Sequence, residues 1–565
     1  MTIADDPYAA NLPWRATGLL AASDLTAADV HVARRLGAIG GEDDERVLLA
    51  AALAVQALRS GSVCVVLDDV EDAPTDWQEA IRRSPLVADG PHGPADRPLR
   101  WVDGRVYLDR YWRDEQTVRA AVHDRLARPA TVDPDVLAAA VDRLYPSAAD
   151  DAQRLALRTA ATSHLTVLTG GPGTGKTTTV ARLVAALQSA AGPRLRVALA
   201  APTGKAAARL QESVNAEVAL LGAADVAAVG SLHAMTVHRL LGRRPGSSTR
   251  FRHDRLRRLP HDVVVVDESS MVSLSLMARL VEALRPTARL VLVGDPDQLV
   301  SVEAGAVLGD LVAAFPRDVV RLTRTHRYGP SLAALAEAIR LGDADTALAV
   351  LRSGDEHLSL VEPTGDRLSP QDVAGLREDV EASSRALVAA ARAGDAPAAL
   401  QALGAHRLLL AHREGPFGVA HWAATVEAWV GAGGGPWPLG RPLLVTENDR
   451  ASGLYNGDTG VVVADGLGGV AVAFGEPDDP RLVRPYRLPA VQPVHAMTVH
   501  RGQGSQFARV TLVLPPVPSP LLTRELLYTA VTRAREHVRV IGTEDAVRAA
   551  VERPVRRASG LREPR

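Results

Sequence analysis

The chain has 565 residues, of which 47% are hydrophobic and 23% are charged, and a formal net charge of −2. This length predicts several domains with large cores, and the near-neutral charge excludes a general attraction to nucleic acid, so any such binding needs a local groove. The one cysteine, Cys64, excludes an intramolecular disulfide and a cysteine-clustered metal site.

The N-terminal segment carries no phosphate or metal motif. Residues 1–135 combine helical periodicity with one strand in "GSVCVVLDD", where we expect Cys64 to be buried, and with a Trp/Tyr group in "WVDGRVYLDRYW". We expect a mainly helical domain that docks a partner protein. The acidic N-terminus lacks a secretory signal, and the longest apolar run is too short to span a membrane, which predicts a cytoplasmic protein.

A phosphate-binding loop is predicted at "TGGPGTGKTTTV", residues 169–180. The stretch fits G-x-x-x-x-G-K-[ST], follows a strand-like run and precedes a helix-like one, which is the context that a P-loop requires. Its backbone N–H groups and the helix dipole favour an anion. A lysine fits between two phosphates better than the arginine used elsewhere in this chain. The predicted ATP-binding residues of the loop are Gly170, Gly171, Pro172, Gly173, Thr174, Gly175, Lys176, Thr177 and Thr178.

Further apolar runs, "LRVALAAP", "DVVVVDES", "ARLVLVGD" and "VVRLT", predict a buried parallel sheet whose ligands lie outside the strand ends. At one strand end we expect Asp267, together with Thr177, to hold Mg²⁺, and the adjacent Glu268 to position and deprotonate the attacking water. At the end of the next strand, the amide of Gln298 would sense the γ-phosphate. An ordinary polar turn is the alternative for each.

A second strand-to-helix junction, "LAAPTGKAAARL", contains Lys205, the other lysine of the chain. Because the P-loop already takes the nucleotide, Pro202, Thr203 and Lys205 at this helix N-terminus predict a contact with a nucleic-acid phosphate. A second nucleotide site is the alternative.

Eight segments together resemble superfamily-1 DNA helicases in order and wording. They are "GGPGTGKTTTV", "APTGKAAARL", "AMTVHRLLG", "VVVVDESSMV", "VGDPDQLVSVEAG", "NGDTGVVV", "AMTVHRGQGSQF" and "LLYTAVTRAR". The resemblance is strongest to the RecD family, the alpha subunits of exodeoxyribonuclease V (the RecBCD complex), and runs from about residue 153 to 537. It implies an α/β fold with two RecA-like P-loop NTPase domains, parallel sheets and an inserted small SH3-like β-barrel.

The resemblance also implies roles for single residues. Gln153 matches the glutamine that reads adenine, and Arg327 and Arg533 match two arginines that the second RecA-like domain presents to the γ-phosphate. Further DNA-binding residues implied by the motifs are His238, Asn456, His500, Gln503 and Ser505. A place in the interdomain cleft is the alternative for the last three. Gln506 stands where the family has a glutamate, so a carboxylate contact at that position is in doubt.

The domain organisation predicted from these features has four parts. They are a partner-docking domain (1–135), a first RecA-like domain (136–320) with a small hairpin near 241–253, a second RecA-like domain (321–435 and 495–565), and the SH3-like insertion (436–494). Residues 365–405 predict amphipathic helices. The basic ending "RPVRRASGLREPR" predicts a disordered tail.

The expected function is an ATP-dependent DNA helicase, with ATP and Mg²⁺ as cofactors, that moves 5′ to 3′ on single-stranded DNA. The resemblance implies RecB-like and RecC-like partners and double-strand break repair and recombination as the setting. Two alternatives stay open: a stand-alone RecD-like helicase, and a structural subunit whose ATPase is silent.

Overall fold

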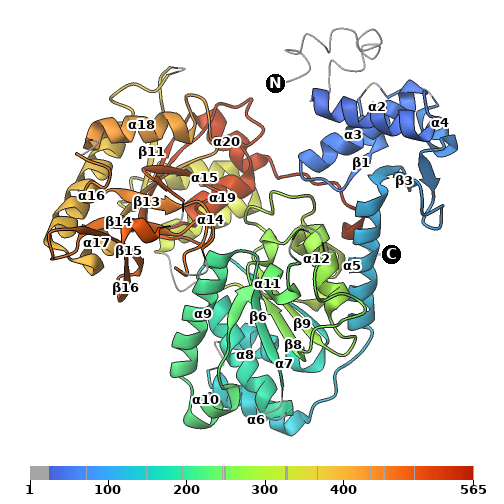
Figure 1. The fold of residues 1–565 in the computed structure, drawn as a ribbon, viewed down its shortest axis with the longest axis horizontal. Helices are drawn as coiled ribbons and strands as arrows, with labels where there is room; N and C mark the ends of the chain where they lie inside the picture. Colours follow the sequence, from blue (N-terminus) through green and yellow to red (C-terminus); the bar gives the residue numbers. More distant parts are fainter. Residues whose placement is uncertain are drawn as a thin grey trace.

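The computed structural model describes residues 25–563, except residues 72, 75, 148, 149, 192–194, 245, 247–249, 325–328, 366, 432, 433, 450, 451 and 489. Arg327 falls in one of these gaps, so this predicted site residue lies outside the described residues. Figure 1 shows three bodies of structure: the N-terminal part in blue, a cyan and green part, and a yellow to red part.

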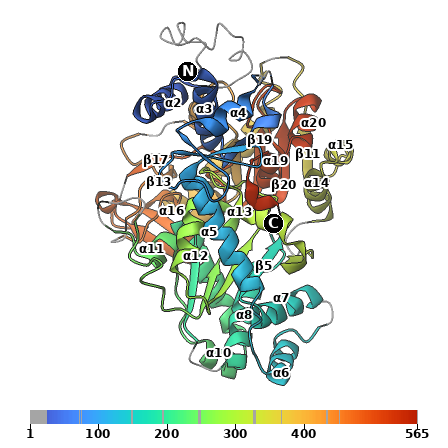
Figure 2. The ribbon, with the colours of Figure 1, turned by 90° about the vertical axis from the view of Figure 1, so that its right-hand side faces the viewer.

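From residue 25 onward, the described residues of the N-terminal part form three α-helices and a small sheet. The helices are α2 (Ala27–Gly40), α3 (Glu45–Arg59) and α4 (Trp77–Arg83), and the strands are β1 (Cys64–Val66), β2 (Val87–Asp89), β3 (Leu99–Val102) and β4 (Arg105–Leu108), in the order β1-β4-β3-β2. Cys64 is buried in β1, which confirms the predicted strand thiol. The long helix α5 (Asp109–Leu126) then runs down beside the next part of the molecule (Figure 2).

The first large sheet has six parallel strands in the order β10-β5-β9-β8-β6-β7. Its strands are β5 (Leu165–Gly170), β6 (Val197–Ala201), β7 (Ala234–Thr236), β8 (Val263–Val266), β9 (Arg289–Gly294) and β10 (Val319–Leu322). The helices around it are α6 (Pro134–Leu144), α7 (Asp151–Thr162), α8 (Lys176–Ala191), α9 (Gly204–Ala219), α10 (Ala223–Val229), α11 (Val237–Leu241), α12 (Leu274–Ala283) and α13 (Val307–Ala314).

The apolar runs of the sequence form the centre of this sheet. Every residue of β5 and β8 is buried, as expected for strands covered by helices on both faces. Hydroxyl side chains cap helices around this sheet: Thr203 accepts the N–H of Ala206 at the start of α9, Thr236 caps α11, and Ser273 caps α12. Strand β10 crosses the predicted domain boundary at residue 320, because it pairs with β5 as far as Leu322.

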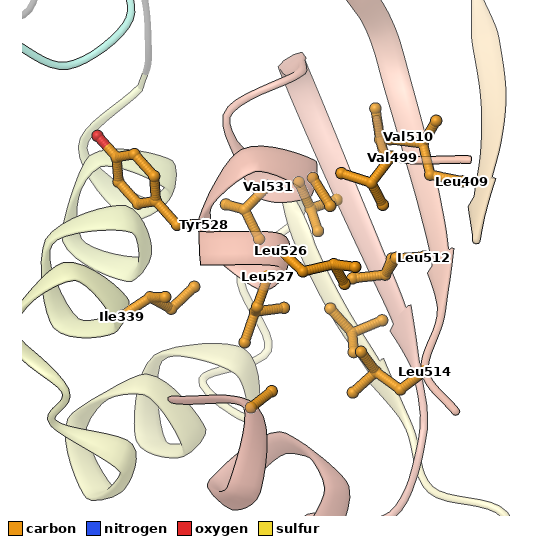
Figure 3. Close-up of a cluster of buried hydrophobic side chains, with 14 of the residues drawn as sticks. Ile339, Leu409, Val499, Val510, Leu512, Leu514, Leu526, Leu527, Tyr528 and Val531 are labelled. Atoms are coloured by element: carbon orange, nitrogen blue, oxygen red, sulfur yellow. The ribbon is translucent and has the colours of Figure 1, made fainter. Parts of the chain in front are cut away.

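The second parallel sheet has five strands in the order β11-β20-β19-β12-β18. They are β11 (Leu358–Val361), β12 (His406–Leu410), β18 (Ala496–Thr498), β19 (Phe507–Val513) and β20 (Ala534–Ile541). The helices are α14 (Pro330–Leu341), α15 (Ala344–Leu351), α16 (Ala374–Ala393), α17 (Ala396–Leu403), α18 (Val419–Val430), α19 (Arg524–Val531) and α20 (Glu544–Glu552), and α16 and α17 are the amphipathic helices predicted for 365–405. Figure 3 shows part of its core, where Leu526, Leu527 and Val531 of α19 pack against strand residues.

An antiparallel sheet is inserted between β12 and β18 along the chain. Its five strands, in the order β16-β15-β14-β13-β17, are β13 (Pro442–Val445), β14 (Thr459–Ala464), β15 (Val470–Glu476), β16 (Asp479–Val483) and β17 (Val491–Pro493). Val461, Val463 and Ala473 of this sheet share a buried cluster with residues of α16 and α17. The insertion is therefore packed onto the second parallel-sheet domain.

The prediction of a disordered C-terminal tail is wrong for residues 553–563. The segment leaves α20 and ends in a short 3₁₀ helix, Gly560–Arg562, in which Leu561 is 1% exposed. The N–H of Val63 donates to the carbonyl of Ala558 at 2.8 Å, and the N–H of Gly560 donates to Glu115 at 2.9 Å. The tail thus joins the second parallel-sheet domain to the N-terminal part, and its end lies beside α5 in Figure 1.

Among the helices in the described parts of the chain, none is both long and apolar enough to cross a bilayer.

Candidate nucleotide and nucleic-acid site

A cavity of about 250 Å³ lies between the two parallel-sheet domains at the P-loop. The first domain contributes P-loop residues, Asp267, Glu268, Gln298 and part of α9. The second domain contributes Gly504, Gln506 and Arg533. The structure therefore brings together the predicted phosphate-binding and acidic residues with one of the two predicted arginines.

The P-loop runs from the end of β5 into α8, which begins at Lys176. Gly173 and Gly175 both have φ of +81°, a conformation that only glycine adopts at little cost. The Lys176 ammonium donates to the carbonyls of Gly170 at 2.6 Å and Gly171 at 2.9 Å. A phosphate bound in the cavity would compete with these carbonyls for the ammonium.

Two carboxylates follow β8 at the floor of the cavity. Glu268 has a φ of +49°, an uncommon conformation for a residue other than glycine, and its N–H donates to Asp267 at 2.9 Å. Burial raises the pKa of Asp267 to about 7, and the neighbouring Glu268 adds to the rise, while Lys176 opposes it. This crowding of negative charge beside the P-loop is typical of a place that a cation stabilises.

An adjoining hollow lies on the other side of the P-loop and contains Gln153, which is buried on α7. Tyr145 and Arg182 line the same hollow, and the guanidinium of Arg182 lies 4.6 Å from the centre of the Tyr145 ring. An aromatic ring, an amide and a guanidinium beside a phosphate loop are suited to contact a base.

Gln298 and Arg533 are both held by hydrogen bonds of their own domain. The Gln298 amide donates to Asp295 at 2.9 Å. The Arg533 side chain, 3% exposed, donates to the carbonyl of Thr529 at 3.0 Å and to the hydroxyl of Thr532 at 3.2 Å. Both side chains are thus positioned by contacts before any ligand is considered.

The predicted DNA-binding residues Lys205, Ser505 and Gln503 lie at the junction of the domains. The Lys205 ammonium donates to the Ser505 hydroxyl at 2.6 Å and to the carbonyl of Gly457 in the insertion at 3.0 Å. Gln503 donates to the carbonyl of Leu299 in the first domain at 2.7 Å. Desolvation lowers the pKa of Lys205 to about 8. Both parallel-sheet domains and the insertion therefore meet at one lysine.

The remaining predicted DNA-binding residues are more dispersed. His238 is exposed, with its ring centre 6.0 Å from that of Phe251, and Asn456 is exposed on the insertion. Burial lowers the pKa of His500, so its half-buried ring is neutral at neutral pH. Pro202 and Thr203 lie at the start of α9, where the Thr203 hydroxyl caps the helix.

Three residues around the site were not predicted from the sequence: Arg209 lines the phosphate cavity, and Asp295 and Tyr528 line the cavity beside it. Gln506, the amide at the position where the family has a glutamate, also lines the phosphate cavity. Arg209 carries a readable signal, since it is one helical turn after Lys205 on α9. Tyr528 carries none in the pattern alone, because its contact depends on how the two domains dock.

Two parallel sheets that share a P-loop cavity, with acidic side chains from one and an arginine from the other, define a P-loop NTPase motor. Three family models match the chain: AAA domain over residues 148–358, UvrD-like helicase C-terminal domain over 493–541, and RecBCD enzyme subunit RecD, N-terminal domain, over 21–76. The fold and these matches make the chain an ATP-dependent DNA helicase.

Full-length relatives identify the family. RecBCD enzyme subunit RecD of Mycobacterium tuberculosis (strain H37Rv) is 51% identical over 100% of this chain and 98% of that protein, and its counterpart in Mycolicibacterium smegmatis is 52% identical over 95% and 97%. The chain belongs to the RecD family.

Two more distant proteins also match part of the chain. The ATP-dependent RecD2 DNA helicase of Deinococcus radiodurans is 33% identical over 80% of this chain but only 57% of that protein. A crystal structure of Bacteroides Pif1 bound to single-stranded DNA aligns with 66% of this chain and 88% of its own, at 17% identity and a TM-score of 0.38.

Proposed function

We propose that this chain is the RecD-like subunit of a RecBCD-type helicase-nuclease, moving 5′ to 3′ along single-stranded DNA at the expense of ATP during double-strand break repair and recombination. The observation that carries the motor is the cavity shared by the P-loop, Asp267, Glu268 and Arg533. The 5′ to 3′ direction is taken from the resemblance to the RecD family.

The phosphate end of ATP would lie in this cavity. Lys176 and the backbone N–H groups of the P-loop neutralise the phosphate oxygens, and Glu268 orients and deprotonates the attacking water. Gln298 detects the γ-phosphate through its amide. Arg533 and Arg327 stabilise the charge that develops on the γ-phosphate oxygens, and their supply from the second domain couples hydrolysis to domain closure.

Mg²⁺ fits the donor set at this place. Thr177 and Asp267 line the same cavity, and a hydroxyl and a carboxylate are the oxygen ligands that this cation prefers. The crowded negative charge on Asp267 and Glu268 is what a divalent cation relieves. When bound, the cation would neutralise charge on the phosphates. On the adenine side, Gln153 would contact the base.

The DNA path would cross the junction at Lys205. Pro202, Thr203, Lys205 and His238 in the first domain, and His500, Gln503 and Ser505 in the second, provide contacts whose strength changes as the domains open and close. Asn456 adds a contact from the insertion. Alternation of these contacts during the ATP cycle turns domain closure into movement along the strand.

The subunit hypothesis is supported by sequence similarity. The identity is 51–52% to the mycobacterial RecBCD subunits and 33% to the RecD2 helicase, and the N-terminal domain model of RecBCD enzyme subunit RecD matches residues 21–76. This similarity favours RecB-like and RecC-like partners over a stand-alone helicase, and the N-terminal part would dock a partner. Because the proposed substrate is chromosomal DNA, we also propose a cytoplasmic location.

ATP hydrolysis by the purified chain, with and without single-stranded DNA, tests the motor. We expect DNA to raise kcat in the wild type, and Lys176→Ala to lower kcat by about 100-fold or more, because the ammonium neutralises charge directly on the transferred phosphate. Equal rates in both proteins would contradict the proposal and favour the silent structural subunit.

Co-expression with the candidate partner subunits tests the assembly. We expect the three chains to co-purify, and a chain that lacks residues 1–108 to lose the complex. A wild-type chain that stays alone and unwinds DNA without partners would favour the stand-alone helicase instead.

A further inference from the structure

We propose that Tyr528 is a positioning residue that links the γ-phosphate sensor of the first domain to the arginine of the second. The inference rests on the roles proposed for Gln298 and Arg533. The tyrosine lies on α19, five residues before Arg533, and its hydroxyl reaches across the domain boundary to Asp295.

The carboxylate of Asp295 gathers two donors from different domains. Its Oδ2 atom accepts the Gln298 amide at 2.9 Å and the Tyr528 hydroxyl at 3.2 Å, and all three side chains are buried. Burial raises the pKa of Asp295, and Lys176, the Gln298 amide, the Asp297 N–H and the Tyr528 hydroxyl oppose the rise. A displacement of Gln298 therefore changes the surroundings of a carboxylate that the second domain also holds.

The same hydroxyl lies against the P-loop. A Cβ atom placed on Gly171 would lie 3.0 Å from the Tyr528 oxygen, a tight contact, so a side chain at this position would crowd the hydroxyl. The Tyr528 ring belongs to the core cluster of the second domain, and Figure 3 shows its hydroxyl pointing away from Leu526, Leu527 and Val531. The ring thus packs in the core of the second domain, while the hydroxyl points out of that core.

The next residue of α19 continues the connection to the arginine. The Thr529 hydroxyl accepts the N–H of Leu299, the residue directly after Gln298, at 2.8 Å. The Thr529 carbonyl accepts the Arg533 side chain at 3.0 Å. Two hydrogen bonds therefore connect α19 to the segment that contains Gln298, and one hydrogen bond connects Arg533 to α19. Together they form a continuous path around the place proposed for the γ-phosphate.

Tyr528→Phe removes only the hydroxyl and keeps the packed ring. We expect the DNA-stimulated kcat for ATP hydrolysis to fall about tenfold, with the KM for ATP changed less than twofold, because the bond orients groups that act in the transition state. The unfolding temperature should stay within about 2 °C of the wild type. Tyr107→Phe, which removes a buried hydroxyl in β4, is the matched control and should leave kcat unchanged.

A double-mutant cycle with Gln298→Ala separates coupling from simple damage. If Tyr528 acts through the sensor, adding Tyr528→Phe to Gln298→Ala costs little further activity. An unchanged kcat in Tyr528→Phe, or losses that multiply in the double variant, would overturn the inference. The proposed motor is judged separately by Lys176→Ala: loss of hydrolysis there, with an unaffected Tyr528→Phe, rejects only the link.

Discussion

Lys205 shows how burial at a domain junction tunes a single side chain. Its ammonium donates to Ser505 and to Gly457, and desolvation lowers its pKa to about 8 from an ordinary value of 10.5. The charged form is therefore present at pH 7 and largely lost at pH 9. A phosphate contact requires the charged form, so DNA binding and proton uptake are linked at this residue.

This link predicts a pH dependence of DNA affinity. Between pH 7 and pH 9, the affinity of the wild type for single-stranded DNA should fall up to about tenfold, because binding must restore one proton to Lys205 above its pKa. Lys205→Arg keeps its charge and should show a flatter profile. Fluorescence anisotropy with a labelled oligonucleotide, without nucleotide, measures both. Parallel profiles for the two proteins would show that Lys205 makes no phosphate contact.

For single residues, the sequence predicts the chemical role of a side chain better than its long-range contacts. The structure brings Lys176, Asp267 and Glu268 into one cavity, and strand ends and a P-loop context can be recognised locally in the sequence. The contact between Lys205 and Ser505 joins residues 300 positions apart, and no local pattern contains it. Arg327 lies outside the described residues, so its role stays a prediction.

The C-terminal tail illustrates what a composition argument misses at the scale of an element. Its basic, proline-containing sequence predicts disorder, yet one apolar side chain, Leu561, inserts into a core shared with α5 and α13. The Glu115 carboxylate, buried in α5, accepts the N–H of Gly560 and so depends on the tail. By contrast, the apolar runs of β5 and β8 predicted the first sheet directly.

Leu561→Ala should therefore destabilise the protein. Truncation of a fully buried leucine to alanine lowers the free energy of unfolding by about 2–5 kcal/mol, because less apolar surface is buried and a cavity remains. Differential scanning calorimetry should show a transition shifted to lower temperature. Leu467→Ala, at a position 85% exposed in a turn of the insertion, is the matched control and should not shift it. If both variants unfold like the wild type, the tail is not packed as described.

In the whole molecule, the proposed nucleotide and DNA sites lie between domains rather than within one domain. The cavity needs both parallel-sheet domains, Lys205 also needs the insertion, and the tail ties the second domain back to the N-terminal part. The sequence predicts four parts in order, with an SH3-like barrel as the insertion, because each part has its own periodicity and turn residues. Their docking could not be predicted, since it depends on surfaces distant along the chain.

We would test the proposed 5′ to 3′ motor first by strand displacement. The substrates are partial duplexes with a 5′ or a 3′ single-stranded overhang, and the chain is used together with its partner subunits. To isolate this motor, Lys176→Ala is compared with the wild type in otherwise identical complexes. We expect Lys176→Ala to remove ATP-dependent unwinding from the 5′ overhang. Equal unwinding of the 5′ overhang by both complexes would contradict the proposed motor.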